Sequence, residues 1–63
     1  MEKFTLYIKC DGAAFDETPA SEIARILRSV ADKIEAEGPS GFYETIRDIN
    51  GNDVGRHALK TEI

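Results

Sequence analysis

Residues 18–39, TPASEIARILRSVADKIEAEGP, contain the start, the periodicity and the end of one long helix. Thr18 suits the N-cap, and Pro19 suits the first helical position, where its missing N–H leaves no hydrogen bond unmade. At the other end, Gly38 adopts a left-handed conformation easily and Pro39 cannot continue a helix. These signals predict a helix of about five turns.

The two faces of this helix differ in character. Apolar residues recur at spacings of three and four and form one stripe: Ala20, Ile23, Ala24, Leu27, Val30, Ala31 and Ile34, with Ile26 beside it. Charged residues occupy the opposite face: Glu22, Arg25, Arg28, Asp32, Lys33 and Glu37. We expect the stripe to be core rather than a surface for a partner helix, and the charged face to be solvated.

The segment before the helix alternates between apolar and polar residues, as a half-buried strand does. One face has Phe4, Leu6, Ile8 and Cys10, and the other has Lys3, Thr5, Tyr7 and Lys9. We expect the first face to be core, with Cys10 as a small buried hydrophobe. The strand breaks at Asp11-Gly12, and Phe15 is predicted to fold back as a plug on the core.

The segment after the helix predicts a hairpin. Asp48-Ile49-Asn50-Gly51 fits a type I turn with a glycine bulge. This turn predicts four pairs across the hairpin, which are Asp48 with Asn52, Arg47 with Asp53, Ile46 with Val54 and Glu44 with Arg56. The alternative two-residue Asn50-Gly51 turn sets Asp48 against Asp53, and like charges directly opposite are unfavourable.

The predicted fold is one α+β domain over residues 1–63, with the order β-α-β-β and the helix on one face of a three-stranded sheet. The elements are a strand at about 3–10, the helix at about 19–37 and a hairpin at about 42–59 with its turn at 48–51. The other sheet face stays uncovered, and exposed aromatic side chains there suit a second copy or a partner. We expect the binding residues on this face: Thr5, Tyr7, Tyr43, Arg47, Arg56 and His57.

Size and cysteine content limit the class of protein. A chain of 63 residues buries only about 60% of the surface that it exposes when unfolded, and Cys10 and His57 are single residues of their kind. Disulfides and histidine–cysteine metal sites are therefore excluded as stabilisers, and we expect a homo-oligomer, with a dimer favoured. A lone cysteine predicts a reducing compartment, the cytoplasm. We expect neither a signal peptide nor a membrane span.

The net charge of −4 opposes binding to nucleic acid unless the basic residues cluster, and they do not cluster in the sequence. Acidic excess has two interpretations: solubility, or a surface that mimics nucleic acid. Solubility is favoured, because the acidic residues are interspersed with lysine and arginine.

No residue pattern predicts catalysis, a metal or a cofactor. Asp48-x-Asn50-x-Asn52 resembles the start of a calcium loop, but Asp53 stands where that loop needs glycine and Leu59 where it needs glutamate. Cys10 and His57 are the only candidates for a nucleophile and its base, and no third orienting group or oxyanion-hole pattern accompanies them. We expect a protein that is not an enzyme.

Several segments resemble a family of short uncharacterised β-α-β-β proteins encoded by bacteriophages, prophages and other mobile elements. The residues that carry the resemblance are Phe4-Thr5-Leu6-x-Ile8, Asp11-x-Ala13-Ala14-Phe15, Glu22 to Arg28 with Ala31-Asp32, and Arg47 to Asn52 with Val54-Gly55. The resemblance implies an accessory protein acting in the cytoplasm of a bacterial host.

Proteins of that origin commonly act by binding. The first hypothesis is an oligomeric inhibitor or modulator of a host anti-phage defence protein, for example a defence nuclease or a CRISPR complex. The second is an oligomeric small-ligand binder, such as a nucleotide sponge that uses Tyr43, Arg47, Arg56 or His57. The third, disfavoured by the net charge, is a nucleic-acid accessory protein.

Overall fold

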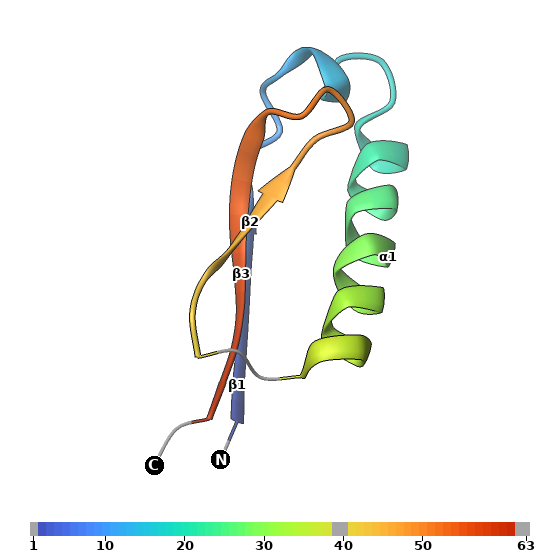
Figure 1. Ribbon diagram of the computed structural model, residues 1–63. Helices are drawn as coiled ribbons and strands as arrows, with labels where there is room; N and C mark the ends of the chain where they lie inside the picture. Colours follow the sequence, from blue (N-terminus) through green and yellow to red (C-terminus); the bar gives the residue numbers. More distant parts are fainter. Residues whose placement is uncertain (1, 39–40, 62–63) are drawn as a thin grey trace.

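The computed structural model describes residues 2–38 and 41–61. In chain order the elements are the strand β1 (Glu2–Ile8), the 3-10 turn η1 (Ala13–Phe15), the helix α1 (Pro19–Glu37) and the strands β2 (Glu44–Arg47) and β3 (Asp53–Thr61) (Figure 1). The predicted α+β fold with the order β-α-β-β is confirmed.

The sheet has the strand order β1-β3-β2, so the last strand lies in the middle. Both outer strands run antiparallel to β3 and hence parallel to each other. The β1 strand pairs with β3 along its whole length, from Glu2 opposite Thr61 to Ile8 opposite Gly55. Both β1 and β2 therefore have one edge that no other strand of the described chain occupies.

The helix begins and ends where the sequence predicts. Pro19 is its first residue and Glu37 its last, and Gly38 follows with φ 69°, in the region that favours glycine. Thr18 takes the N-cap position and accepts a hydrogen bond from the Glu22 backbone through its carbonyl, although its side chain makes no capping bond. Pro39 lies outside the described residues.

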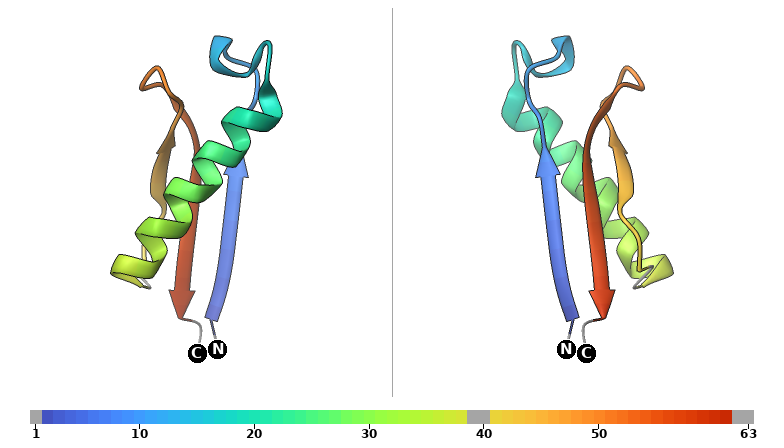
Figure 2. Two further views of the ribbon diagram at one scale, coloured as in Figure 1. Left: turned by 90° about the vertical axis from the view of Figure 1, so that its right-hand side faces the viewer. Right: turned by 90° about the vertical axis from the view of Figure 1, so that its left-hand side faces the viewer.

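The helix crosses one face of the sheet diagonally, from the end of β1 toward the start of β2 (Figure 2). The core beneath it consists of four buried residues, Phe15, Ile26, Val30 and Ile46, with partly buried Leu6, Ile8, Ala14, Ile23, Ile34 and Val54 around them. The predicted Phe15 plug is confirmed.

Three details of the predicted core are wrong. Leu27, placed within the apolar stripe, is 44% exposed, whereas Ile26, placed beside it, is 2% exposed. The diagonal crossing also leaves the far end of β1 uncovered, so that Phe4 is 47% exposed. In addition, β1 ends at Ile8, and Cys10 lies beyond the strand with an exposed thiol instead of in the core.

The predicted turn of the hairpin is present. The Gly51 N–H donates to the Asp48 carbonyl at 3.0 Å, and Gly51 has φ 86°. The Asp48 N–H donates to the Asn52 carbonyl at 2.9 Å, and Arg47 lies opposite Asp53, as the turn type predicts.

On the side of Arg47 away from the turn, the predicted register is wrong, because a bulge shifts the pairing of β2 with β3 by one residue between Ile46 and Arg47. The observed partners are Ile46 with Gly55, Thr45 with Arg56 and Glu44 with His57. The bulge makes Val54 an extra residue on β3, so the side chains that follow it face the side opposite to the one the predicted register gives. His57 therefore points toward α1 and Arg56 points away from it.

Candidate functional site

The face of the sheet turned away from α1, called the open face from here on, is toward the viewer in the right panel of Figure 2. Strand alternation and register place ten side chains on it or at its ends. They are Lys3, Thr5, Tyr7 and Lys9 from β1 and its extension, Asp53, Arg56, Ala58 and Lys60 from β3, and Thr45 and Arg47 from β2. Tyr43 precedes β2 and joins them, because the Lys60 ammonium lies 4.4 Å from the centre of its ring.

Basic side chains are concentrated on the open face. Among the described residues it carries five of the eight lysines and arginines but only two of the eleven carboxylates, those of Asp53 and of Asp11, which pairs with Lys9. The face thus has a formal charge of 5 − 2 = +3, and the other described residues have 3 − 9 = −6. The acidic excess lies outside the open face, so the open face does not mimic the negatively charged surface of a nucleic acid.

Two hollows on the open face each combine a tyrosine with cations. One, of about 80 Å³, is lined by Lys3, Thr5, Tyr43 and Lys60. The other is wider and more open, about 360 Å³, and is lined by Tyr7, Lys9, Asp53, Val54, Gly55 and Arg56. Tyr7 is 65% exposed and Tyr43 59%, so most of each side chain is available to a partner.

The cations of the open face differ in how far they are neutralised. Arg56 forms an ion pair with Asp53, which holds the pKa of that carboxyl below its usual range, and Lys9 lies 3.5 Å from Asp11. Lys3 and Lys60 are directly opposite each other on β1 and β3. Like charges in that position repel, so an anion between them would be stabilising.

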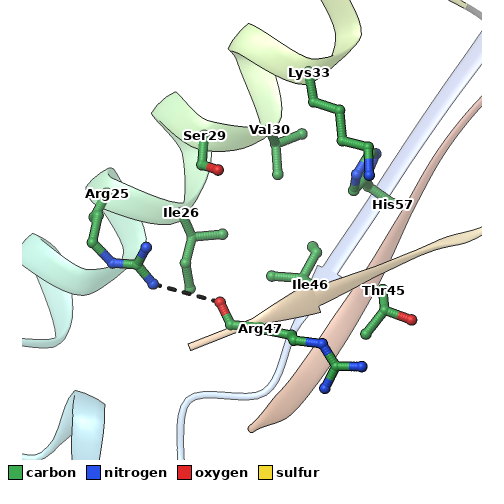
Figure 3. Close-up of a pocket in the computed structure, with 9 residues that line it drawn as sticks. All are labelled: Arg25, Ile26, Ser29, Val30, Lys33, Thr45, Ile46, Arg47 and His57. Carbon is green, nitrogen blue, oxygen red and sulfur yellow. Dashed lines mark hydrogen bonds between the residues drawn. The ribbon is translucent and has the colours of Figure 1, made fainter. Parts of the chain in front are cut away.

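A third hollow lies on the other side of the sheet, between α1 and β2, and is called the helix groove from here on (Figure 3). It has a volume of about 250 Å³ and an apolar floor formed by Ile26, Val30 and Ile46. Its other lining residues are polar or charged: Arg25, Ser29, Lys33, Thr45, Arg47 and His57.

The cations of the helix groove already have partners within the chain. Arg25 pairs with Glu22 at 2.6 Å, and Lys33 pairs with Glu44 at 2.6 Å. The hydrogen bond to Lys33 holds the pKa of Glu44 below its usual range. Arg47 donates to the Gly51 carbonyl at 3.2 Å. An anion in this groove would therefore compete with existing contacts.

Glu22 was predicted on the solvated helix face, and this is wrong. It is 6% exposed and accepts hydrogen bonds from Arg25 at 2.6 and 3.0 Å and from the Ile49 N–H at 2.8 Å. The bond from Arg25 holds the pKa of Glu22 below its usual range. The carboxylate ties the first turns of α1 to the β2–β3 turn, which is a structural role.

Asp48 is also a buried carboxylate with a structural role. Its side chain accepts hydrogen bonds from the backbone N–H groups of Asn50 and Asn52, both at 2.9 Å, and from the Asn52 amide at 3.1 Å. Burial alone raises the pKa of Asp48, but these hydrogen bonds outweigh it and lower the pKa. The alternation that suggested calcium is thus the bonding pattern of the turn.

Five of the six predicted binding residues, Thr5, Tyr7, Tyr43, Arg47 and Arg56, lie on the open face. The sixth, His57, is only 5% exposed, lies on the face toward α1, and has a buried Nδ1 without a hydrogen-bond partner. Its predicted position on the open face is wrong, because the bulge reverses the side-chain direction.

Three lysines of the open face were left out of the predicted binding set. The alternation of β1 already placed Lys3 and Lys9 beside Tyr7, and this signal was sufficient to find them. Lys60 was missed because β3 continues to Thr61, past the predicted end near Leu59.

The only candidate nucleophile and base do not meet. Cys10 lies two residues past the end of β1, whereas His57 is opposite Leu6 in the middle of that strand and is buried. Among the described residues, no cluster of three or more histidine, cysteine, aspartate or glutamate side chains is arranged to hold a metal ion.

Within residues 2–38 and 41–61, no helix combines the length and the apolarity needed to cross a lipid bilayer. Comparisons of the chain with protein-family models, with curated proteins and with solved structures found no match.

Proposed function

We propose that this protein is a non-enzymatic binding protein and that the open face binds an anionic macromolecule. The observation that carries the proposal is the separation of charge, +3 on the open face against −6 on the other described residues. A protein whose cations served only solubility would have no reason to gather five of eight of them on one sheet face.

Charge separation of this kind has a consequence for binding. The field near the open face attracts an anionic partner and orients the protein as the two approach, which raises the association rate. The net negative charge of the other described residues disfavours approach of the same partner with the protein turned the other way. An anion on the open face also relieves the repulsion between Lys3 and Lys60.

The absence of enzymatic activity is part of the proposal. Its support is that the most buried carboxylates, Glu22 and Asp48, are engaged in hydrogen bonds that hold the fold together. Cys10 and His57 lie apart, and no described group has the mutual geometry of a nucleophile, a base and an orienting residue.

Self-association is the second part of the proposal. The chain exposes 4538 Å², against roughly 4,000 Å² expected for a monomer of 7.0 kDa. Its radius of gyration is 12.4 Å, against about 10.6 Å expected for 63 residues. The exposed Phe4 and Leu27 and the free edge of β1 favour a dimer, and light scattering over a range of concentrations tests this. A monomer at every concentration contradicts it.

The resemblance to phage and mobile-element proteins supplies the setting of the proposal, a bacterial cytoplasm. In that setting the anionic partner belongs to the host or to the invading element. The protein would then inhibit or modulate a host defence protein in one of two ways. It would bind the anionic molecule on which the defence protein acts, or it would bind an anionic molecule that is part of the defence complex.

A second candidate function is binding of a small anionic ligand in the helix groove. The observation that favours it is the unpartnered, buried Nδ1 of His57 at the groove wall. The four residues that the sequence suggested for a nucleotide site are not together, because the side chains of Tyr43, Arg47 and Arg56 lie on the open face and that of His57 lies on the face toward α1. A thermal-shift panel of nucleotides tests this function, since a ligand at 100 times its Kd stabilises by about 2.7 kcal/mol.

The main proposal is tested with a labelled polyanion. Fluorescence anisotropy with dye-labelled heparin at low salt should show binding that weakens as salt is added. Lys3→Gln should weaken it, whereas Arg28→Gln, which removes the same charge from an exposed position on α1, should not. No binding at low salt, or equal effects of the two variants, would refute a role for the open face.

A further inference from the structure

We propose that the anionic partner of the open face is a single-stranded nucleic acid, whose bases stack on Tyr7 and Tyr43 while its phosphates contact the surrounding cations. This inference rests on the proposed function, because it assigns a partner to the same surface. It does not follow from net charge, which by itself disfavours nucleic acid.

Each tyrosine has a largely exposed ring beside cations. Tyr7 is 65% exposed and Tyr43 59%, and each lines a hollow that also contains basic side chains. The Lys60 ammonium lies 4.4 Å from the centre of the Tyr43 ring and covers one of its faces, so a base would stack on the other face. Proteins that bind single strands combine such exposed rings with a basic surface that follows the backbone. One stacked base changes affinity about 5- to 100-fold when its ring is removed.

The two rings serve different bases. They lie on opposite sides of the central strand, because Tyr7 pairs with Arg56 from β1 and Tyr43 lies next to Lys60 on the β2 side. With strands 4.7–4.9 Å apart and about 3.3 Å per residue, the backbones of the two tyrosines are roughly 10 Å or more apart, and their rings line separate hollows. One base cannot cover both rings, so a strand of several nucleotides is needed.

Phosphates suit the positions between the rings. Lys3 and Lys60 are directly opposite each other beside Tyr43, and their repulsion is relieved by an anion that bridges them. Near Tyr7, Arg56 keeps its charge beside Asp53, and Lys9 lines the same hollow. A strand that crosses the sheet from one hollow to the other therefore meets cations at both ends of its path and passes Thr5 and Ala58 between them.

Two other anionic partners fit less well. A duplex keeps its base faces inside the stack, so the tyrosine rings would have no base to stack on. An acidic protein segment supplies carboxylates for the lysines but leaves both rings without a matching surface. The combination of exposed aromatic rings and cations on one face is what selects the single strand.

Fluorescence anisotropy with dye-labelled oligonucleotides of about 12 nucleotides tests the inference, with site sizes of roughly 4–16 nucleotides as a guide. The probes are single-stranded DNA, single-stranded RNA, a duplex of the same length and polyglutamate. We expect tighter binding to a single strand, of either kind, than to the duplex or to polyglutamate. With three to five phosphate contacts, log K should fall against log salt with a slope of about −2 to −3.5.

The variants separate charge from stacking. Lys3→Gln should make the salt slope shallower by about 0.7, and Arg28→Gln should leave it unchanged. Tyr7→Ala should weaken binding about 5- to 100-fold with little change of slope, and Tyr7→Phe should restore it. Tyr43→Ala is the second test of stacking if Tyr7→Ala does not fold.

The outcomes distinguish this inference from the proposed function. Binding to heparin without preference for single strands, or full binding by both tyrosine-to-alanine variants, overturns the single-strand inference and leaves the open face as a general anion-binding surface. No binding to any polyanion at low salt overturns both.

Discussion

Gly55 is the position where the smallest possible substitution should have the largest effect on the sheet. It lies opposite both Ile8 and Ile46, at the point where all three strands meet. A Cβ atom added there would stand 1.9 Å from the Tyr7 carbonyl oxygen and 2.9 Å from its carbon. Both atoms are backbone, so no side-chain rotation removes the clash.

The size of the effect follows from the distance that the strands must move. Restoring ordinary contact at 3.4 Å requires a displacement of 3.4 − 1.9 = 1.5 Å between β1 and β3. The bond from the Lys9 N–H to the Val54 carbonyl, now 2.7 Å, would then be broken. Overpacking costs about 1–3 kcal/mol and a lost hydrogen bond about 0.5–1.5 kcal/mol, which gives a loss of about 1.5–4.5 kcal/mol.

This loss is large beside a total stability of about 3–9 kcal/mol for 63 residues. Urea unfolding followed by far-UV circular dichroism measures it for Gly55→Ala. Gly12→Ala is the matched control, because the nearest atom to a Cβ there is Asp48 Oδ2 at 3.8 Å. Equal midpoints for the two variants would show that β1 does not approach Gly55 as described.

Three further predictions concern side chains whose environment the structure defines. The free energy of unfolding should fall as the pH drops below about 4.5, because the hydrogen bond from Arg25 lowers the pKa of Glu22 in the folded protein and the unfolded chain therefore binds more protons. In Glu22→Gln the urea midpoint of unfolding should depend less steeply on pH. A pH dependence as steep as that of the unsubstituted protein contradicts this. Cys10 should react with a maleimide without denaturant, because its thiol is exposed, and protection in the folded protein would place it in an interface. His57→Leu should leave stability unchanged or raise it, because it removes the unpartnered Nδ1, and a loss above about 1.5 kcal/mol in urea unfolding would reveal a partner for that atom.

The elements of the fold could be predicted from local signals because each signal acts within a few residues. Pro19 and Gly38 bound the helix through backbone conformation alone, and the Asp48–Gly51 turn closes through bonds between neighbours. Such signals require no knowledge of the rest of the chain. This is why the element order and the helix ends agree with the structure.

The errors occur where distant parts of the chain decide the outcome. Leu27 and Ile26 are equally apolar, and which one is buried depends on the diagonal angle at which α1 crosses the sheet. Glu22 has the pattern of a surface residue, and only its contact with Ile49, 27 positions away, shows its structural role. The spacing of apolar residues along the helix predicts neither the burial of Ile26 instead of Leu27 nor the contact of Glu22 with Ile49.

Only those residues of the open face that share one strand could be placed together from the sequence, because grouping residues of different strands requires the pairing of distant segments. Thr5 and Tyr7 share a face by alternation along one strand, which sequence shows directly. The clustering of Lys3 with Lys60 requires the pairing of β1 with β3, two segments at opposite ends of the described chain. A count of charges over the whole chain therefore did not reveal the cluster of basic side chains that the folded sheet brings together.

The bulge between Ile46 and Arg47 implies that the length of β3 matters more than its composition. A one-residue insertion after Gly55 would turn every later residue of the strand to the opposite face and present His57 and Leu59 to solvent, whereas a deletion of Val54 would remove the extra residue and leave both side chains facing α1. After such an insertion Arg56 and Lys60 would face the core although no residue type had been exchanged. In a laboratory evolution experiment, single-residue insertions after Gly55 should be far less tolerated than substitutions, and a deletion of Val54 in the same chain should restore the protein.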